Sequence, residues 1–215
     1  MRRVLGCVMA AIVAWAGSAS SQLTGFTSTP TLSDDGTKVS NVIAVDFLGS
    51  LGGVQMLLEL TEGTILQEIA FGSPIDVAPG SGLAAAAGGL QFDTYFALGD
   101  LFSDGPNAAG APSLGGGAVG IRTTDTSSIL SDTTLSQAFN PPGGLTILDR
   151  TNFVIAQIAL SSDAQGTFRL LVAAGSPPSD LVELDVRDGV ILPEPATAGL
   201  LGAAVLTLGC RHRRF

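Results

Sequence analysis

The chain has 215 residues, 46% of them hydrophobic, and a formal net charge of −9 at pH 7. This length allows one domain together with terminal targeting segments. The two cysteines, Cys7 and Cys210, and the only histidine, His212, all lie near the ends. The central part of the chain therefore excludes cysteine nucleophiles, Ser-His-Asp triads, disulfides and zinc sites built on histidine or cysteine.

The first predicted element is a secretory signal peptide over residues 1–21. Arg2 and Arg3 precede the apolar run VLGCVMAAIVAWAG, and small residues follow it. This is the order of charged, hydrophobic and cleavage regions in such peptides. The small residues predict cleavage just before Ser20 or Gln22. A retained membrane anchor is the alternative, but the apolar run is shorter than the roughly 20 residues that span a bilayer.

Without its two ends the chain is more acidic. The body, residues 22–191, contains 18 acidic residues and five basic ones, so its formal net charge is −13. The basic residues are Lys38, Arg122, Arg150, Arg169 and Arg187. Because such a surface repels phosphates and anionic lipids, we predict no nucleic-acid partner.

Short segments rich in β-branched residues, separated by Gly, Pro, Asp, Asn and Ser, predict an all-β body. We expect a single antiparallel β-sandwich or jelly-roll-like domain, flanked by an N-terminal signal helix and a C-terminal transmembrane helix. The runner-up is a β-rich domain with one short helix. Predicted strands are Val39–Leu48, Val54–Leu60, Thr64–Phe71, Phe92–Leu98, Ala118–Thr123, Leu145–Leu148, Phe153–Ser161, Thr167–Ala173, Leu181–Val186 and Gly189–Leu192.

Several connections follow from the turn residues. Gly49–Gly53 predicts a turn between the first two strands, and Ser73–Leu90 predicts a long loop with at most one helical turn at Ala84–Ala87. The polar stretch Ser162–Gly166 predicts a hairpin between the strands that flank it. Asp188-Gly189 predicts a second tight turn near the end of the body.

The stretch FDTYFAL, residues 92–98, alternates aromatic with other residues. Phe92 and Phe96 are expected to face the core, with Tyr95 on the other face of the strand. The only tryptophan, Trp15, lies in the signal peptide and Tyr95 is the sole tyrosine. Tyr95 and these phenylalanines are therefore the aromatic candidates for stacking on a sugar.

Asp100, Asp104 and Asn107 lie in one loop and form a weak candidate calcium site, because calcium prefers oxygen ligands. Their spacing does not match an EF-hand, and a solvated turn is the alternative reading. Some pair of carboxylates with glycosidase spacing is expected by chance among 18 acids. We predict no catalytic residue and no cofactor.

The last 24 residues, 192–215, have three parts. Pro193-Glu194-Pro195 ends the last strand, because proline lacks a backbone donor. An apolar run, residues 196–209, suits a short membrane helix. Arg211, Arg213 and Arg214 follow it and are expected to stay on the cytoplasmic side.

This arrangement resembles the PEP-CTERM sorting signal of bacterial exported proteins. The resemblance implies that an exosortase, a membrane protease, recognises Pro193, Glu194 and Pro195 and removes the tail. The alternative is an ordinary C-terminal anchor. The body is similar to uncharacterised β-rich domains of planctomycete-type exported proteins; the similar stretches are FDTYFALGD (92–100), GGLTILDRTNF (143–153) and ALSSDAQGTFRLL (159–171).

The sequence therefore predicts an exported protein that is anchored briefly in the inner membrane and then reaches the cell surface or the extracellular matrix. The expected partners are signal peptidase and, as the resemblance implies, an exosortase-like protease, both acting on the chain as a substrate. Extracellular polysaccharide is a further candidate. The leading hypothesis is a non-enzymatic structural or interaction role. The alternatives are a carbohydrate-binding or carbohydrate-cleaving module and calcium-dependent adhesion.

Overall fold

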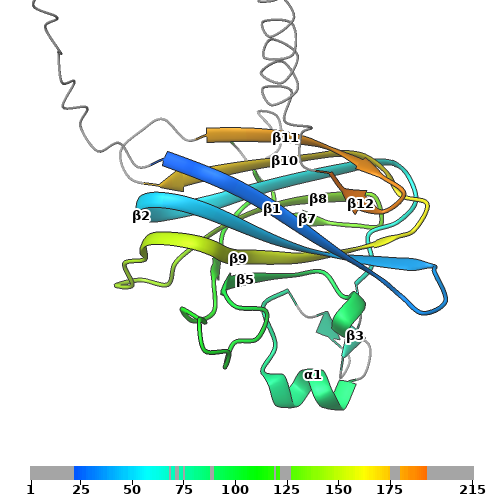
Figure 1. Ribbon diagram of the computed structural model, residues 1–215, viewed down its shortest axis with the longest axis horizontal. Coiled ribbons are helices and arrows are strands. Elements are labelled where there is room, and N and C mark those ends of the chain that lie inside the picture. Colours follow the sequence, from blue (N-terminus) through cyan, green and yellow to red (C-terminus); the bar gives the residue numbers. More distant parts are fainter. Residues whose placement is uncertain are drawn as a thin grey trace, which may run out of the picture.

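The computed structural model describes residues 22–67, 69–70, 73–74, 76–87, 90–118, 120–121, 127–174 and 180–192. The described chain is mostly antiparallel β-sheet (Figure 1). Its strands are β1 (Gln22–Leu32), β2 (Lys38–Glu62), β3 (Ile69–Ala70), β4 (Ser73–Pro74), β5 (Tyr95–Gly99), β6 (Ser113–Leu114), β7 (Ile129–Leu130), β8 (Thr134–Asn140), β9 (Leu148–Ser161), β10 (Gln165–Ala174), β11 (Asp180–Arg187) and β12 (Val190–Ile191). The helical elements are α1 (Ser81–Ala87) and a 3-10 turn, η1 (Leu90–Phe92).

The long strand β2 organises the fold. Residues 38–50 of β2 pair with β1 on one side and with β9 on the other, and β9 in turn pairs with β5. Residues 51–62 pair with β10 and β8, and β11 and β12 continue beyond β10. We call these two groups of strands the first arm and the second arm. Both belong to one hydrogen-bonded sheet, because β2 runs through both.

The inner faces of both arms contribute to one hydrophobic core. In the first half of β2 the inward residues have odd numbers, such as Ile43 and Phe47. In the second half they have even numbers, such as Met56 and Leu58. The change of phase coincides with a β-bulge, where β10 pairs with Gly53 and then with Leu51. A bulge inserts one residue and bends the strand, so the two halves of β2 can face the same interior.

The predicted turn at Gly49–Gly53 is therefore wrong. The chain does not reverse there, and the two predicted strands are one continuous strand. Gly49 has a φ of 87°, which glycine adopts readily, and Gly52 lies in the bulge. The glycines bend β2 and do not end it.

The predicted hairpin around Ser162–Gly166 is also wrong in its pairing. Both strands exist as β9 and β10, but β9 pairs with the first half of β2 and β10 with the second half. The turn carries the chain from one arm to the other, with Ser162 N donating to Thr37 O at 2.9 Å. The prediction assumed that strands adjacent in the sequence pair with each other, whereas β9 and β10 both pair with β2.

The turn at Asp188-Gly189 is confirmed. It joins β11 to β12, and both residues have positive φ, 51° and 74°. Two successive positive φ values are typical of the tight turns that suit the twist of a hairpin.

The segment between β2 and β8 differs in detail from the prediction. The helical turn expected at Ala84–Ala87 is α1, which begins earlier, at Ser81. Phe92 lies in η1 and not in a strand, so the expected face shared by Phe92 and Phe96 does not form. Residues 64–67 contain only an isolated bridge from Ile65 to Leu160. Residues 118 and 120–121 are not in a strand.

Candidate functional site

The residues of the predicted sorting signal lie outside the part of the chain that the structure describes. These are Pro193, Glu194, Pro195, Arg211, Arg213 and Arg214, and the predicted signal peptide lies outside it as well. Among the described residues, no helix has the length and apolar character needed to cross a membrane.

The three calcium candidates lie in the loop that follows β5, but each carboxylate already accepts hydrogen bonds. Asp104 accepts from the backbone N and the hydroxyl of Ser81, at 2.8 and 2.7 Å. These hydrogen bonds hold the pKa of Asp104 below its usual value. Asp100 accepts from Phe102 N at 3.5 Å and from Asn107 N at 3.4 Å. Asp104 thus ties the loop to the start of α1, and Asp100 closes the loop on itself.

Tyr95 does not stand on a wet face. It is 2% exposed, and every residue of β5 is buried. Its hydroxyl donates to Gln157 Oε1 at 3.3 Å. Burial, followed by the charges of Asp93 and Asp100, raises the pKa of Tyr95 well above its usual value. Tyr95 and Phe96 do lie on opposite faces, since Phe96 packs in the main core and Tyr95 in a smaller cluster. Because Tyr95 is buried, it has no surface on which a sugar could stack.

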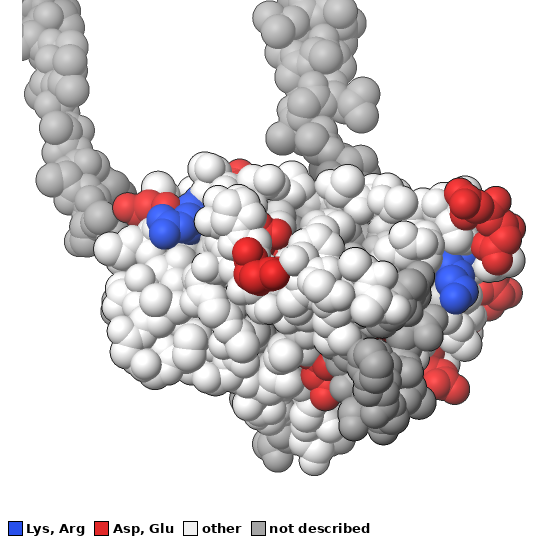
Figure 2. Space-filling model, turned by 90° about the horizontal axis from the view of Figure 1, so that it is seen from below, with Lys and Arg blue, Asp and Glu red and all other residues white. Residues whose placement is uncertain are grey.

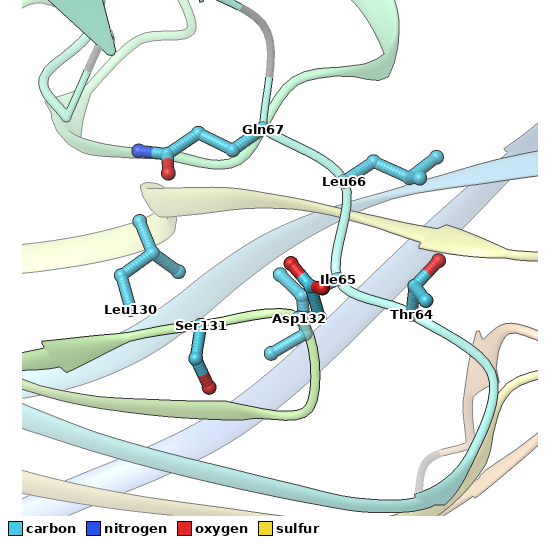
Figure 3. A pocket seen from close by; sticks show the side chains of 7 residues that line it. All are labelled: Thr64, Ile65, Leu66, Gln67, Leu130, Ser131 and Asp132. Carbon is cyan, nitrogen blue, oxygen red and sulfur yellow. The ribbon is translucent and has the colours of Figure 1, made fainter.

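One cleft, of about 520 Å³, lies where the two arms meet. Figure 3 shows its lining, in which residues 64–67 face residues 130–132. Ile65 N donates to Asp132 O at 2.6 Å, and Leu66 N donates to Ala159 O at 2.8 Å. Residues 64–67 therefore connect the turn before β8, in the second arm, to β9, in the first arm. We interpret this cleft as the seam between the arms.

A second cleft, of about 570 Å³, lies between the loop after β5 and the start of β9. We call it the Arg150 cleft. Its lining residues are Gly99, Pro106, Asn107, Ala108, Ala109, Leu145, Arg150, Thr151, Asn152 and Phe153. Asn107, Arg150, Thr151 and Asn152 are exposed, whereas Phe153 is buried. The cleft thus combines a buried aromatic residue with exposed side chains that can form hydrogen bonds.

The wall of this cleft is an irregular stretch of β9. The pairing of β9 with β2 shifts on both sides of Phe47, and Asp149 and Asn152 have positive φ values of 34° and 51°. Asp46 Oδ1 accepts from Asn152 N at 2.5 Å, and Asp149 Oδ1 accepts from Gly49 N at 2.6 Å. A carboxylate from each strand therefore holds the backbone of the other, which fixes a conformation that these residues adopt only at some cost.

Arg150 differs from the other arginines that the structure describes. Arg169 contacts Glu183 at 2.7 Å and Glu59 at 3.5 Å, and Arg187 contacts Asp185 at 2.6 Å. Among the described residues Arg150 has no such carboxylate partner. Its Nη1 donates instead to Leu148 O at 2.7 Å and to Asp149 O at 3.2 Å. The face seen in Figure 2 is mostly uncharged, and acidic groups lie at both of its ends and near its middle.

The sequence did not single out Arg150 or its cleft. The only signal was the occurrence of Asp149 and Asn152 inside a segment otherwise typical of a strand, since both residues tolerate positive φ. Among the described residues, no group of three or more His, Cys, Asp or Glu side chains is placed to hold a metal ion.

We compared the chain with protein-family models, with curated proteins and with solved structures, and none of them matches it.

Proposed function

We propose that the chain is an exported protein whose C-terminal tail is an exosortase-type sorting signal. The observation that carries this proposal is the order of the last 24 residues, in which Pro193-Glu194-Pro195 precedes an apolar run and three arginines. The N-terminal pattern of a signal peptide supports it independently. The signal helix and the C-terminal membrane helix, with the arginines on the cytoplasmic side, are part of the proposal.

The strands that the structure describes belong to the proposed body, residues 22–191. At its end, Leu192 N donates to Asp185 O at 2.9 Å, next to the last described strand, β12.

We further propose that the body, residues 22–191, is a β-sandwich, or jelly-roll-like domain, with a structural or interaction role outside the cell and no enzymatic activity. The sandwich is supported by the main hydrophobic core, to which the inner faces of both arms contribute. A non-enzymatic role is supported by the use of the carboxylates, which are the most plentiful reactive groups of the body. Several of them accept hydrogen bonds from backbone amides and so have a structural role. Asp46, Asp100, Asp104 and Asp149 all do so.

Signal peptidase and an exosortase-like protease are the proposed partners, and the chain is their substrate. Anchoring in the inner membrane is then transient, and the cell surface or the extracellular matrix is the destination. Extracellular polysaccharide is a third proposed partner, and the exposed polar lining of the Arg150 cleft favours it.

Mass spectrometry of the C-terminus tests the sorting proposal. In the cells that produce the protein, we expect the surface form to lack the arginine-containing tail. Glu194→Ala should leave the tail in place, whereas Glu62→Ala, which removes an exposed acid from the body, should not affect processing. Recovery of the intact, arginine-terminated wild type as the stable surface form would refute the proposal.

A further inference from the structure

We propose that the Arg150 cleft binds a carboxylate-bearing saccharide, that is, a uronic acid unit of a polysaccharide. This inference rests on the interaction role proposed above and gives it a site and a class of ligand. It is carried by the charge of the cleft, by the way in which Arg150 is held, and by the chemistry of the lining.

The body is strongly acidic, with a formal net charge of −13. In such a protein each arginine is expected to have a carboxylate neighbour, as Arg169 and Arg187 do. Arg150 lines a cleft and lacks one among the described residues. Asp149 precedes Arg150 in the sequence, and Asp46 lies next to Phe47, the strand partner of Arg150 on β2. Each of these carboxylates uses an oxygen on a backbone amide, Asp149 on that of Gly49 and Asp46 on that of Asn152. The guanidinium is thus available to an anion from outside.

Arg150 is also held in position. Its Nη1 donates to two carbonyls of its own segment, Leu148 O and Asp149 O. The described structure gives the Nε and Nη2 groups no partner, and a guanidinium presents its N–H groups in a fixed plane that matches a carboxylate. Because the two strands are clamped by Asp46 and Asp149, little further ordering is needed when a ligand binds.

The lining favours a saccharide as the carrier of the carboxylate. Asn107 on one wall and Thr151 and Asn152 on the other offer amide and hydroxyl groups, which can donate to and accept from sugar hydroxyls. Leu145 is 40% exposed and offers an apolar surface to the C–H groups of a sugar ring. The volume of about 570 Å³ lies within the usual range for small-molecule sites.

Binding of defined trisaccharides to the full-length chain tests the proposal by isothermal titration calorimetry. We expect trigalacturonate to bind and uncharged maltotriose not to bind. Arg150→Gln should weaken binding of trigalacturonate by at least about tenfold, the range expected for hydrogen bonds to a charged group. Arg150→Lys should fall between the wild type and this variant, because lysine keeps the charge but loses the planar pair of donors.

Arg187→Gln is the matched control, since it removes the same charge from an exposed arginine outside the cleft. It should leave binding unchanged. If Arg150→Gln lowers the melting temperature, Asn107→Ala, on the opposite wall, replaces it and should weaken binding several-fold.

The proposal would be overturned by no binding of trigalacturonate to the folded wild type, by equal binding of maltotriose, or by equal loss of affinity in the Arg187 control. Tighter binding of a triglutamate peptide would also overturn it, in favour of an acidic peptide ligand. The sorting proposal is tested separately by the fate of the tail. A failure of either experiment therefore leaves the other result interpretable.

Discussion

Asn41 connects three parts of the fold, and its replacement by alanine is the sharpest test of how the two arms are held together. The residue is 0% exposed and belongs to the first half of β2. Its amide nitrogen donates to Gly189 O at 2.9 Å and to Ile158 O at 3.3 Å. Its amide oxygen accepts from Ile191 N at 3.1 Å. One side chain thus joins β2 and β9 of the first arm to the β11–β12 turn of the second arm.

The expected loss follows from the groups that Asn41→Ala leaves behind. Gly189 O and Ile191 N are bonded to Asn41 in a buried environment. A buried donor or acceptor without a partner costs about 1–3 kcal/mol, so two of them cost about 4 kcal/mol. For a protein of this size that corresponds to a fall in melting temperature of roughly 8–16 °C.

Urea unfolding of the full chain, followed by circular dichroism, measures this loss. Asn140→Ala is the matched control, because Asn140 is exposed and its side chain only donates to the adjacent Pro141 O. We expect the control to lose less than about 0.5 kcal/mol, as is usual for surface substitutions. A loss below about 1 kcal/mol for Asn41→Ala would refute the conclusion that this side chain joins the arms.

Two further predictions concern titration. Hydrogen bonds from Ser33, and then from Thr37, lower the pKa of Asp35 from 3.8 to about 2. Since the folded value lies below the unfolded one, the stabilisation is present above the unfolded pKa and is lost as the pH falls through about 2. An NMR titration should show this midpoint, and Ser33→Ala should move it toward 3.8; an unchanged midpoint would contradict the assignment. Tyr95 is the only tyrosine, so ultraviolet absorbance reports it alone. Because its pKa is raised by burial, the folded chain should keep a neutral phenol above its usual value of 10, and stability should fall as the pH rises through that value. Ionisation near pH 10 without unfolding would contradict its burial.

The strands were predictable where local pattern decides them. β11 and the Asp188-Gly189 turn follow from β-branched residues and from residue types that tolerate positive φ. The partners of the strands were not predictable, because pairing depends on residues far apart in the chain. β2 is long enough to pair with both β9 and β10, so their adjacency in sequence did not make them a hairpin. Glycine is common both in tight turns and in β-bulges, so the glycines at 49, 52 and 53 did not distinguish a turn from a bulge.

The candidate site was less predictable than the fold. The cleft around Arg150 depends on Asp46, which holds its wall, and on the loop at Asn107, which forms the opposite wall. These residues lie about 100 and about 40 positions away from Arg150 in the chain. Tyr95 was misjudged for the same reason. An alternating strand predicts one wet face, but the loops that cover β5 bury both faces.

The shared strand β2 also determines when the body can fold. Each half of β2 needs a partner from the last third of the body, since β9 begins at Leu148 and β10 at Gln165. Closing such long loops precedes any gain from the contacts, so we expect slow folding with high contact order. In a chain that emerges with its N-terminus first, the first half of β2 therefore lacks β9, and the second half lacks β10, until most of the body has emerged. The first arm can then be completed before the second, because β9 precedes β10, β11 and β12 in the chain.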